Sequence, residues 1–510
     1  MKSIGNRRWW ALGALSLGVV AVGLDVTVLG VALPTLAVSL QASESDLQWF
    51  FSGYALVLAA GMLPAGVLGD RFGRKRVLVT ALVLFGAGSI ACAFSVTPAQ
   101  FIAGRLVLGA AGAAIVVMAL SVMTVLFSEE ERPRAVGVWA AANFLSLPIG
   151  PIFGGWLLTN YWWGWIFLMN VPVALLGIVA AAALIPESRA ARRPALDPLG
   201  MLLACGGLAT LTYGLIELGR NGWTNAPSLA LAVAGVAVIV GFFLWEGRLT
   251  RLGAGPLIDL SLFRSTGFTW GVILATLGGL ALIGLVFTLP QYSQGVLGLD
   301  PQGAGIRLLP IILGLVAGAV PADRIAERAG PRMTIATGFA ITTAGLAVGA
   351  TTQVDSDAWF VAAWMAVVGF GMGVGFATAA SAALKNVPSD RSGVASALIQ
   401  AMQKVGAPLG SAIFGSVVVS IYQSQLALGG FPPVAAAAVK ESVFAGVAVA
   451  NELQSQPLLA SVRESFVRGM DAALFVSAAI AAIAILVALI FMPGRKAVVS
   501  TESAAVERVA

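Results

Sequence analysis

The chain alternates between long apolar segments and short charged or Gly/Pro-rich segments. A bilayer core needs about 20 apolar residues per helix, and segments of this kind recur along the whole sequence. We therefore expect an all-α membrane protein. The pattern predicts fourteen membrane-spanning helices near residues 10–34, 47–69, 77–94, 100–126, 135–158, 163–185, 199–218, 228–247, 267–290, 301–323, 333–351, 358–383, 393–420 and 469–492.

One further stretch, residues 434–450, is nearly apolar enough to be another span. Lys440 and Glu441 lie near its middle, where charges are costly in a bilayer. We interpret residues 421–468 as a long external loop that carries one or two surface helices after Pro432-Pro433.

The basic residues indicate the orientation. Cytoplasmic loops of membrane proteins are enriched in Lys and Arg, and most of the 30 Lys and Arg residues fall in alternate loops, on the side of both chain ends. We expect both termini to be cytoplasmic and the protein to lie in the cell membrane. Because topology accounts for the net charge of +6, no nucleic-acid partner is expected.

Composition excludes several kinds of chemistry. Hydrophobic residues make up 58% of the chain and charged residues 11%, against about 25% charged in a soluble domain. The chain has no histidine, and its two cysteines lie in apolar runs. It also lacks the Gly-x-x-x-x-Gly-Lys-[Ser/Thr] phosphate-binding motif. We expect no metal site, no cofactor and no enzymatic activity, so that transport would draw on an ion gradient.

A motif occurs twice where a predicted span reaches the cytoplasm. The first copy, GVLGDRFGRKR, covers residues 66–76, and the second, GAVPADRIAERAGPR, covers residues 318–332. They end the second and tenth spans, which suggests two six-helix halves separated by two inserted helices. The expected units are an N-terminal bundle (1–185), a linker with the inserted helices (186–266), a C-terminal bundle including the external loop (267–492) and a cytoplasmic tail (493–510).

The first motif copy resembles the signature loop of the major facilitator superfamily. Three further motifs resemble those of its fourteen-helix drug:proton antiporter branch, and a fourth segment also fits. These are LDVTVLGVALP at 24–34, Arg105 with Gly109 and Gly112, GPIFGG at 150–155, and WIFLMNVP at 165–172. The resemblance implies a major facilitator fold and a proton-coupled exporter of amphiphilic drugs or antibiotics.

Asp25 and Arg105 are the candidate proton-coupling residues. Asp25 lies well inside an apolar span, where an ionised carboxylate is costly unless it is paired or hydrated. The alternative is that Asp25 is only a structural partner of a nearby hydroxyl or cation, and that Arg105 only ties helices together. Gly109 and Gly112 share a helix face with Arg105, so they permit close approach of another helix or access for a substrate.

The candidate substrate cavity comprises Asn143, Gln400, Gln403 and Lys404. Lys404 lies in mid-span on a polar stripe that also includes Ser396 and Ser411, and such a stripe should face a cavity or a partner helix rather than lipid. The resemblance implies acidic residues near here in exporters of organic cations. A lysine would instead favour neutral, zwitterionic or acidic substrates, unless it neutralises Asp25 or another acid.

Two further groups carry expected conformational roles. The proposed switch at the membrane edge comprises Gly66, Asp70, Arg71, Gly73 and Arg74 with the repeat copies Asp323 and Arg324; plain positive-inside anchoring is the alternative. In the fifth span, Gly150, Pro151, Gly154 and Gly155 are expected to kink the helix and let a neighbour pack closely.

The sequence thus predicts a proton-driven exporter working by alternating access. We expect it to act as a monomer, with amphiphilic small molecules, protons and the lipid bilayer as its partners. Two alternatives stay open: an exporter of lipid or lipoprotein precursors on the same fold, and a transporter-like membrane sensor or scaffold that moves nothing.

Overall fold

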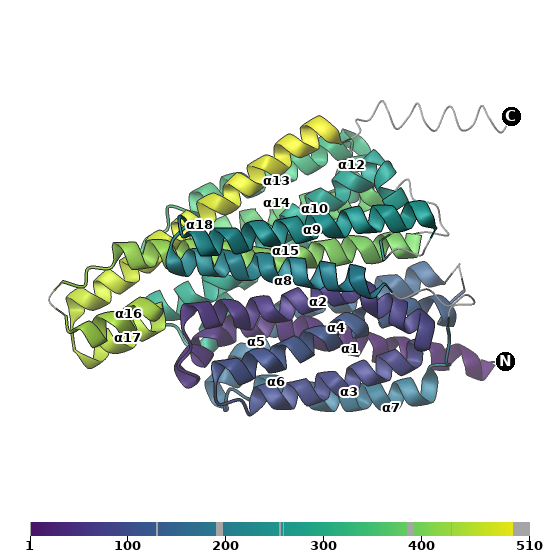
Figure 1. Cartoon of the computed structure of the whole chain (residues 1–510), viewed down its shortest axis with the longest axis horizontal. Coiled ribbons are helices and arrows are strands. Elements are labelled where there is room, and N and C mark those ends of the chain that lie inside the picture. The colour runs from purple at the N-terminus through teal and green to yellow at the C-terminus, as the bar shows by residue number, and fades with distance from the viewer. Residues whose placement is uncertain are drawn as a thin grey trace.

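The computed structural model describes residues 2–128, 131–189, 197–253, 257–258, 260–384, 392–429 and 431–492. Within these residues the chain forms helices and turns, with no β-strand. The long helices run roughly parallel or antiparallel to one another, and the N-terminal end of the first lies at the same end of the molecule as the C-terminal end of the last (Figure 1). We call this the terminal end of the bundle.

The first six predicted spans pack on one another as one group. Several begin with a side chain that caps the free backbone N–H groups of the first turn; Ser43 and Asp46, for example, form a reciprocal capping box. The helices of this N-terminal group are α1 (Lys2–Ser39), α2 (Glu44–Phe72), α3 (Arg74–Ala93), α4 (Pro98–Leu126), α5 (Arg132–Asn160), and α6 (Trp165–Leu168) with α7 (Asn170–Leu184).

The last six predicted spans form a second group with the same pairing order. In the first group α2 packs on α4, α1 on α5 and α3 on α7; in the second α12 packs on α14, α10 on α15 and α13 on α18. The helices of this C-terminal group are α10 (Thr266–Gln291) continued by the π-helical turn η2 (Tyr292–Val296), α11 (Pro301–Arg307) with α12 (Leu309–Ala329), α13 (Pro331–Gly349), α14 (Ala358–Leu384), α15 (Ser392–Gln425) and α18 (Gln456–Phe491).

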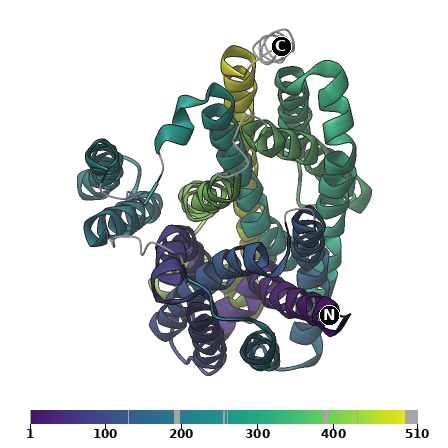
Figure 2. The same cartoon turned by 90° about the vertical axis from the view of Figure 1, so that its right-hand side faces the viewer.

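Two helices lie beside these groups. They are α8 (Pro198–Asn221) and α9 (Ala226–Leu252), and the short 3-10 helix η1 (Leu260–Arg264) follows them. Helix α8 packs on α2 of the first group and on α15 of the second, while α9 packs mainly on α8. Viewed from the terminal end, the pair stands to one side of the two groups (Figure 2).

The segment between the last two spans is helical but does not cross the bundle. It contains α16 (Pro433–Glu441) and α17 (Val443–Glu452), which project at the end opposite the termini (Figure 1). Helices of nine and ten residues are too short to span a bilayer. The expected loop 421–468 is shorter in the structure, because α15 continues to Gln425 and α18 begins at Gln456.

Twelve helices of the described part are long and apolar enough to cross a membrane. The chain is therefore a multi-pass membrane protein. Two of the fourteen predicted spans, at α5 and α13, are not among the twelve, so the count of fourteen stays a prediction. Both helices nevertheless pack inside their groups, α5 on α1 and α13 on α14.

The two motif copies share a local backbone feature. Gly73 and Gly330 each separate two consecutive helices with a positive φ, of 117° and 83° respectively, in the range where glycine is favoured because it has no Cβ. Asp323 lies seven positions before Gly330, whereas Asp70 lies only three positions before Gly73. The second copy therefore carries about one extra helical turn.

Four glycines interlock α12 with α14. A Cβ on Gly314 or Gly318 would meet the backbone of α14 at Ala366 or Phe370, and one on Gly369 or Gly373 would meet the backbone of α12. Small residues spaced by four let membrane helices approach closely. The nearby Gly371 faces Gly338 of α13 instead. The glycine-rich run 369–375 therefore packs α14 against two neighbours.

We expect Gly373→Val to destabilise the C-terminal group, because the added methyl groups meet backbone that cannot move aside. Overpacking of this kind costs roughly 1–3 kcal/mol. Thermal unfolding of the purified protein in detergent, followed by tryptophan fluorescence, measures the effect. Gly206→Val on α8 is the matched control, since no atom lies within 4 Å of a Cβ there. Equal unfolding temperatures for the two variants would contradict this packing.

Candidate functional site

A buried ion pair joins two helices of the N-terminal group. Arg105 of α4 donates from Nη1 to Asp25 Oδ2 of α1 at 2.5 Å. Both side chains are about 1% exposed, so water contributes almost nothing to solvating either charge. Each charge is therefore stable in this buried position because the opposite charge lies next to it. The structure brings together the two residues that the sequence singled out for proton coupling.

A third helix completes the surroundings of the arginine. Arg105 donates from Nε to the Phe50 carbonyl oxygen of α2 at 3.1 Å, and its guanidinium lies over the Tyr54 ring, 4.1 Å from the centroid. Tyr54 in turn donates to the Val22 carbonyl oxygen of α1 at 3.4 Å. Arg105 thus holds α1, α2 and α4 together through an ion pair, a hydrogen bond and a cation–π contact.

The two glycines after Arg105 make this arrangement possible. A Cβ on Gly109 would lie 2.5 Å from the Tyr54 carbonyl oxygen, and one on Gly112 would lie 3.1 Å from the Tyr54 hydroxyl. Of the two sequence interpretations, access for a substrate or approach of a helix, the structure therefore shows the second. Glycine at these positions lets α2 come close enough to present Phe50 and Tyr54 to the guanidinium.

The two carboxylate oxygens of Asp25 differ in their hydrogen bonding. Oδ2 accepts the bond from Arg105, while Oδ1 is buried and accepts no hydrogen bond from the described residues. A buried acceptor without a donor is costly, so Oδ1 is the carboxylate oxygen that is free to accept a hydrogen bond or a proton. The pair is thus chemically suited to exchange a proton.

The glycine motif of α5 faces two different helices. Gly150 and Gly154 lie against Thr27 and Val28 of α1, and Thr27 donates from Oγ1 to the Ser146 carbonyl oxygen at 3.3 Å. On another face, a Cβ on Gly155 would lie 2.6 Å from the Pro301 carbonyl oxygen of α11, and the Pro151 carbonyl lies against Gly305. The motif therefore packs α5 onto α1 within its own group and onto α11 of the other group. Helix α5 is continuous, and the kink stays a prediction.

Contacts between the two groups gather at the end opposite the termini. There α2 packs on α15, α5 on α11, and α1 on α10. The hydrogen bonds at these contacts include Ser52 Oγ to Ser411 Oγ at 2.6 Å, Gln294 Nε2 to the Val31 carbonyl oxygen at 2.8 Å, and Gln302 N to Thr159 Oγ1 at 3.3 Å.

The expected cavity residues lie on α5 and α15. The side chains of Asn143 and Gln400 fall outside the described residues. Lys404 is half-buried, and no described hydrogen bond or ion pair involves it. Asp25, the acid named in the alternative that Lys404 neutralises a carboxylate, is paired with Arg105. Lys404 lies seven residues before Ser411, which contacts Ser52 of α2, so Lys404 shares the face of α15 that points to the N-terminal group. The backbone of Gln403 contacts Gly279 of α10.

The switch residues of both motif copies contact helices of their own group. Arg74 pairs with Asp70 at 2.9 Å and donates to the Ser121 carbonyl oxygen of α4 at 3.2 Å. Asp323 accepts from Ser381 Oγ of α14 at 3.0 Å, and α14 is the counterpart of α4 in the second group. Of the remaining switch residues, Arg71 lies 5.8 Å from the Phe72 ring centroid, Gly66 lies against Val117 of α4, and Arg324 is exposed.

Sequence reasoning missed several contributors to these sites. Glu187, just after α7, accepts from the Lys75 backbone at 3.3 Å and pairs with Arg76 at 3.5 Å, so it anchors the first motif. In the sequence, Glu187 could have been recognised as a single acidic residue at the end of a span, opposite a basic loop. Tyr54 and Phe50 were harder to recognise from the sequence. Tyr54 stands out only as one of five tyrosines in the chain. Phe50 contributes its backbone carbonyl, a group that every residue has.

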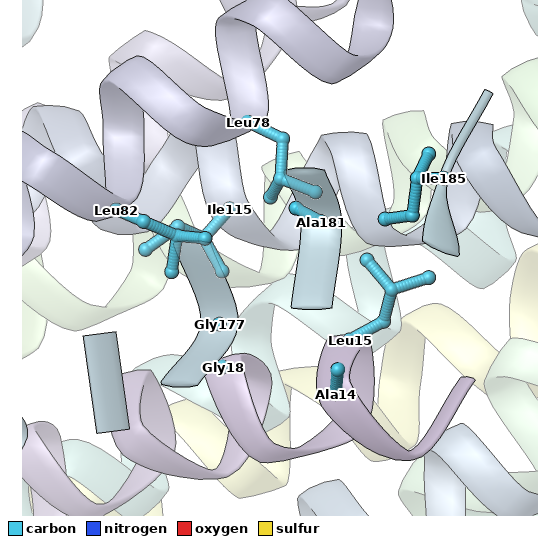
Figure 3. Close-up of a pocket in the computed structure, with 9 residues that line it drawn as sticks. All are labelled: Ala14, Leu15, Gly18, Leu78, Leu82, Ile115, Gly177, Ala181 and Ile185. Atoms are coloured by element: carbon cyan, nitrogen blue, oxygen red, sulfur yellow. The ribbon is translucent and has the colours of Figure 1, made fainter. Parts of the chain in front are cut away.

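One small cavity near the ion-pair helices is apolar. It holds about 10 Å³ among α1, α3, α4 and α7, and aliphatic side chains and glycines line it (Figure 3). A void of this kind has no hydrogen-bonding partner for water or a polar ligand. We regard it as a packing defect of the N-terminal group rather than a site.

Two similar helical groups that meet at one end, with a buried ion pair inside one of them, are the architecture of a secondary membrane transporter. The family pattern of the Major Facilitator Superfamily matches residues 15–411. The chain belongs to this superfamily, and it is a transporter rather than an enzyme.

Characterised relatives cover nearly the whole chain. The tetracenomycin C resistance and export protein of Streptomyces glaucescens is 32% identical over 95% of this chain and 91% of its own length. The multidrug efflux pump LfrA of Mycolicibacterium smegmatis is 31% identical over 95% of both chains. The methyl viologen resistance protein SmvA of Salmonella typhimurium is 31% identical over 92% of this chain and 95% of its own.

Solved structures show the same fold at low identity. A bacterial homologue of the human lysosomal transporter Spinster, in an inward-facing and unoccupied conformation, superimposes with a TM-score of 0.67 at 16% identity, covering 95% of this chain and 98% of that one. A D-xylose-proton symporter superimposes with a TM-score of 0.60 at 16% identity over the same shares of the two chains.

We expect Arg105→Gln to destabilise the protein more than Asp25→Asn/Arg105→Gln does. The single change leaves a buried carboxylate without its counter-ion, which costs roughly 3–5 kcal/mol, whereas the double change removes both charges. Thermal unfolding in detergent of the wild type, both single variants and the double variant gives the coupling between the two sites. Strictly additive effects would show that the pair does not act as a unit.

Proposed function

We propose that this protein is a proton-coupled antiporter that exports amphiphilic drugs or antibiotics across the cell membrane, with both termini in the cytoplasm. The observation that carries the proposal is the Asp25–Arg105 ion pair, buried inside the first group of a transporter fold. The relatives named for antibiotic export, multidrug efflux and methyl viologen resistance support the substrate class. They favour drug export over the lipid-exporter and scaffold alternatives.

Proton coupling follows from the electrostatics of the pair. When Asp25 is ionised, Arg105 is neutralised and its helices are held together. When Asp25 takes up a proton, Arg105 loses its counter-ion and becomes an uncompensated buried cation, which is unfavourable. The conformation that supplies Arg105 with water or another acceptor is then preferred. Each charge carried across a potential of 100 mV supplies about 2.3 kcal/mol, enough to bias two states that differ by a few kcal/mol.

Alternating access follows from where the two groups meet. With cytoplasmic termini, the contacts Ser52–Ser411 and Thr159–Gln302 close the outer side, so this conformation faces inward. Transport would require these contacts to break and new ones to form at the terminal end. The two motif copies lie at that end, and we propose that Asp70, Arg74 and Asp323 exchange partners there as the halves rock. A monomer suffices for this cycle.

We expect Asp25→Asn to abolish drug export, because an amide cannot take up and release a proton. Cells carrying the variant should be as drug-sensitive as cells without the protein. Purified wild-type protein should release protons when substrate is added, whereas the variant should not. Glu452→Gln, at an exposed acid of α17, is the control and should behave as wild type.

Full export by Asp25→Asn would rule out Asp25 as the coupling residue. If the wild type released no protons on adding substrate and moved none of the compounds, the non-transporting sensor or scaffold would be favoured instead. Competition between lipids and drugs in proteoliposomes tests the lipid-exporter alternative.

Lys404 is proposed to set the charge preference of the substrate cavity. It has no acidic partner among the described contacts and shares the face of α15 that points to the N-terminal group. A cation there repels cationic substrates and favours neutral, zwitterionic or acidic ones.

We expect Lys404→Glu to shift export towards cationic amphiphiles and away from acidic ones. Lys404→Gln, which removes the charge, should have a selectivity between those of the wild type and Lys404→Glu. Resistance profiles over a matched panel of cationic, neutral and acidic compounds measure the shift. Unchanged selectivity in Lys404→Glu, with export still active, would refute the role of this residue.

A further inference from the structure

A polar cavity lies at the end of the bundle opposite the termini. It encloses about 180 Å³, where α2, α8, α15 and α16 meet. One water molecule needs roughly 10–15 Å³ of such space, so the cavity has room for a ligand of several heavy atoms. Its ionisable lining residues are Glu44, Arg220, Lys440 and Glu441, and Gln48 and Gln423 are among its polar ones.

Glu44 and Gln48 are the most buried polar side chains of this cavity, and each has one oxygen atom without a hydrogen-bond partner in the described residues. Glu44 is 6% exposed and Gln48 is 1% exposed, and the Oε1 atom of each is buried without a hydrogen-bond partner in the described residues. Gln48 packs tightly on Gly415 of α15, where a Cβ would lie 2.7 Å from its amide carbon. Because both orphan atoms are acceptors, the missing group must be a hydrogen-bond donor.

The charges of the cavity favour a cation at that position. Glu44 is its buried charge, whereas Arg220, Lys440 and Glu441 are exposed and are therefore largely solvated. None of the described ion pairs joins any of these four residues to another. A buried carboxylate without a protein counter-ion attracts a cation and repels an anion.

We propose that this cavity is an outer binding site for the ammonium group of a small organic cation, held by Glu44 and Gln48. An ammonium group offers three N–H donors and a positive charge, which matches two unpaired acceptors and one uncompensated carboxylate. The exposed rim accommodates the rest of the ligand. The site lies on the seam between the halves, since Glu44 and Gln48 belong to α2 and Gly415 to α15. It is separate from the Asp25–Arg105 pair.

Equilibrium dialysis of the purified full-length protein tests the site, with benzylammonium as the probe and benzyl alcohol as its neutral analogue. Wild type should bind the ammonium saturably and the alcohol weakly. Glu44→Gln should weaken ammonium binding roughly tenfold or more, because a charge-assisted hydrogen bond is lost. Glu441→Gln removes an exposed carboxylate of the same cavity and should change affinity by about twofold at most. Asp25→Asn should bind as wild type, even if its transport is lost.

A labelling experiment keeps the proposal testable if Glu44→Gln folds poorly. In a Cys205→Ser background, Ser45→Cys places a thiol on the cavity wall, and benzylammonium should slow its reaction with a thiol reagent whereas benzyl alcohol should not. Equal binding by Glu44→Gln and wild type, or equal protection by both compounds, would overturn the proposal and leave a cavity that holds water only.

Discussion

The cost of burying charge in an apolar helix bundle constrains the whole N-terminal group. Asp25 and Arg105 are each 1% exposed on the side chain, and neither would be stable there alone. Their pairing requires α1, α2 and α4 to approach closely, which Gly109 allows by leaving the Tyr54 carbonyl room. We propose that the same pair also carries proton coupling, and in that case one interaction serves both stability and function.

Close approach of helices is the second constraint, and glycine meets it repeatedly. In lipid there is no hydrophobic force between helices, so association depends on van der Waals packing and interhelical hydrogen bonds. Gly314 and Gly373 on α12 and α14, and Gly154 on α5, lie directly against backbone or side chains of their own half. Packing within each half is therefore rigid, and rigid halves are what a rocking mechanism needs.

The seam between the halves combines glycine packing, as between α5 and α11, with polar contacts. It includes small polar contacts such as Ser52–Ser411 and Thr159–Gln302, whose partners water can replace. Exchange of these polar contacts for water suits two states that are close in free energy. The same seam holds Glu44 and Gln48, whose orphan acceptors lie where the halves would part.

The duplicated motif at 66–76 and 318–332 indicated the repeat. The alternation of long apolar and short polar segments by itself determined the membrane class and the approximate positions of the helices, because the bilayer sets span length and leaves few alternatives. It also singled out Asp25 and Arg105, since charges within spans are rare. Only the tertiary structure decided their partners. The Phe50 carbonyl, Glu187 and the packing role of glycines 369–375 depend on which helix faces which, and no local pattern carries that information.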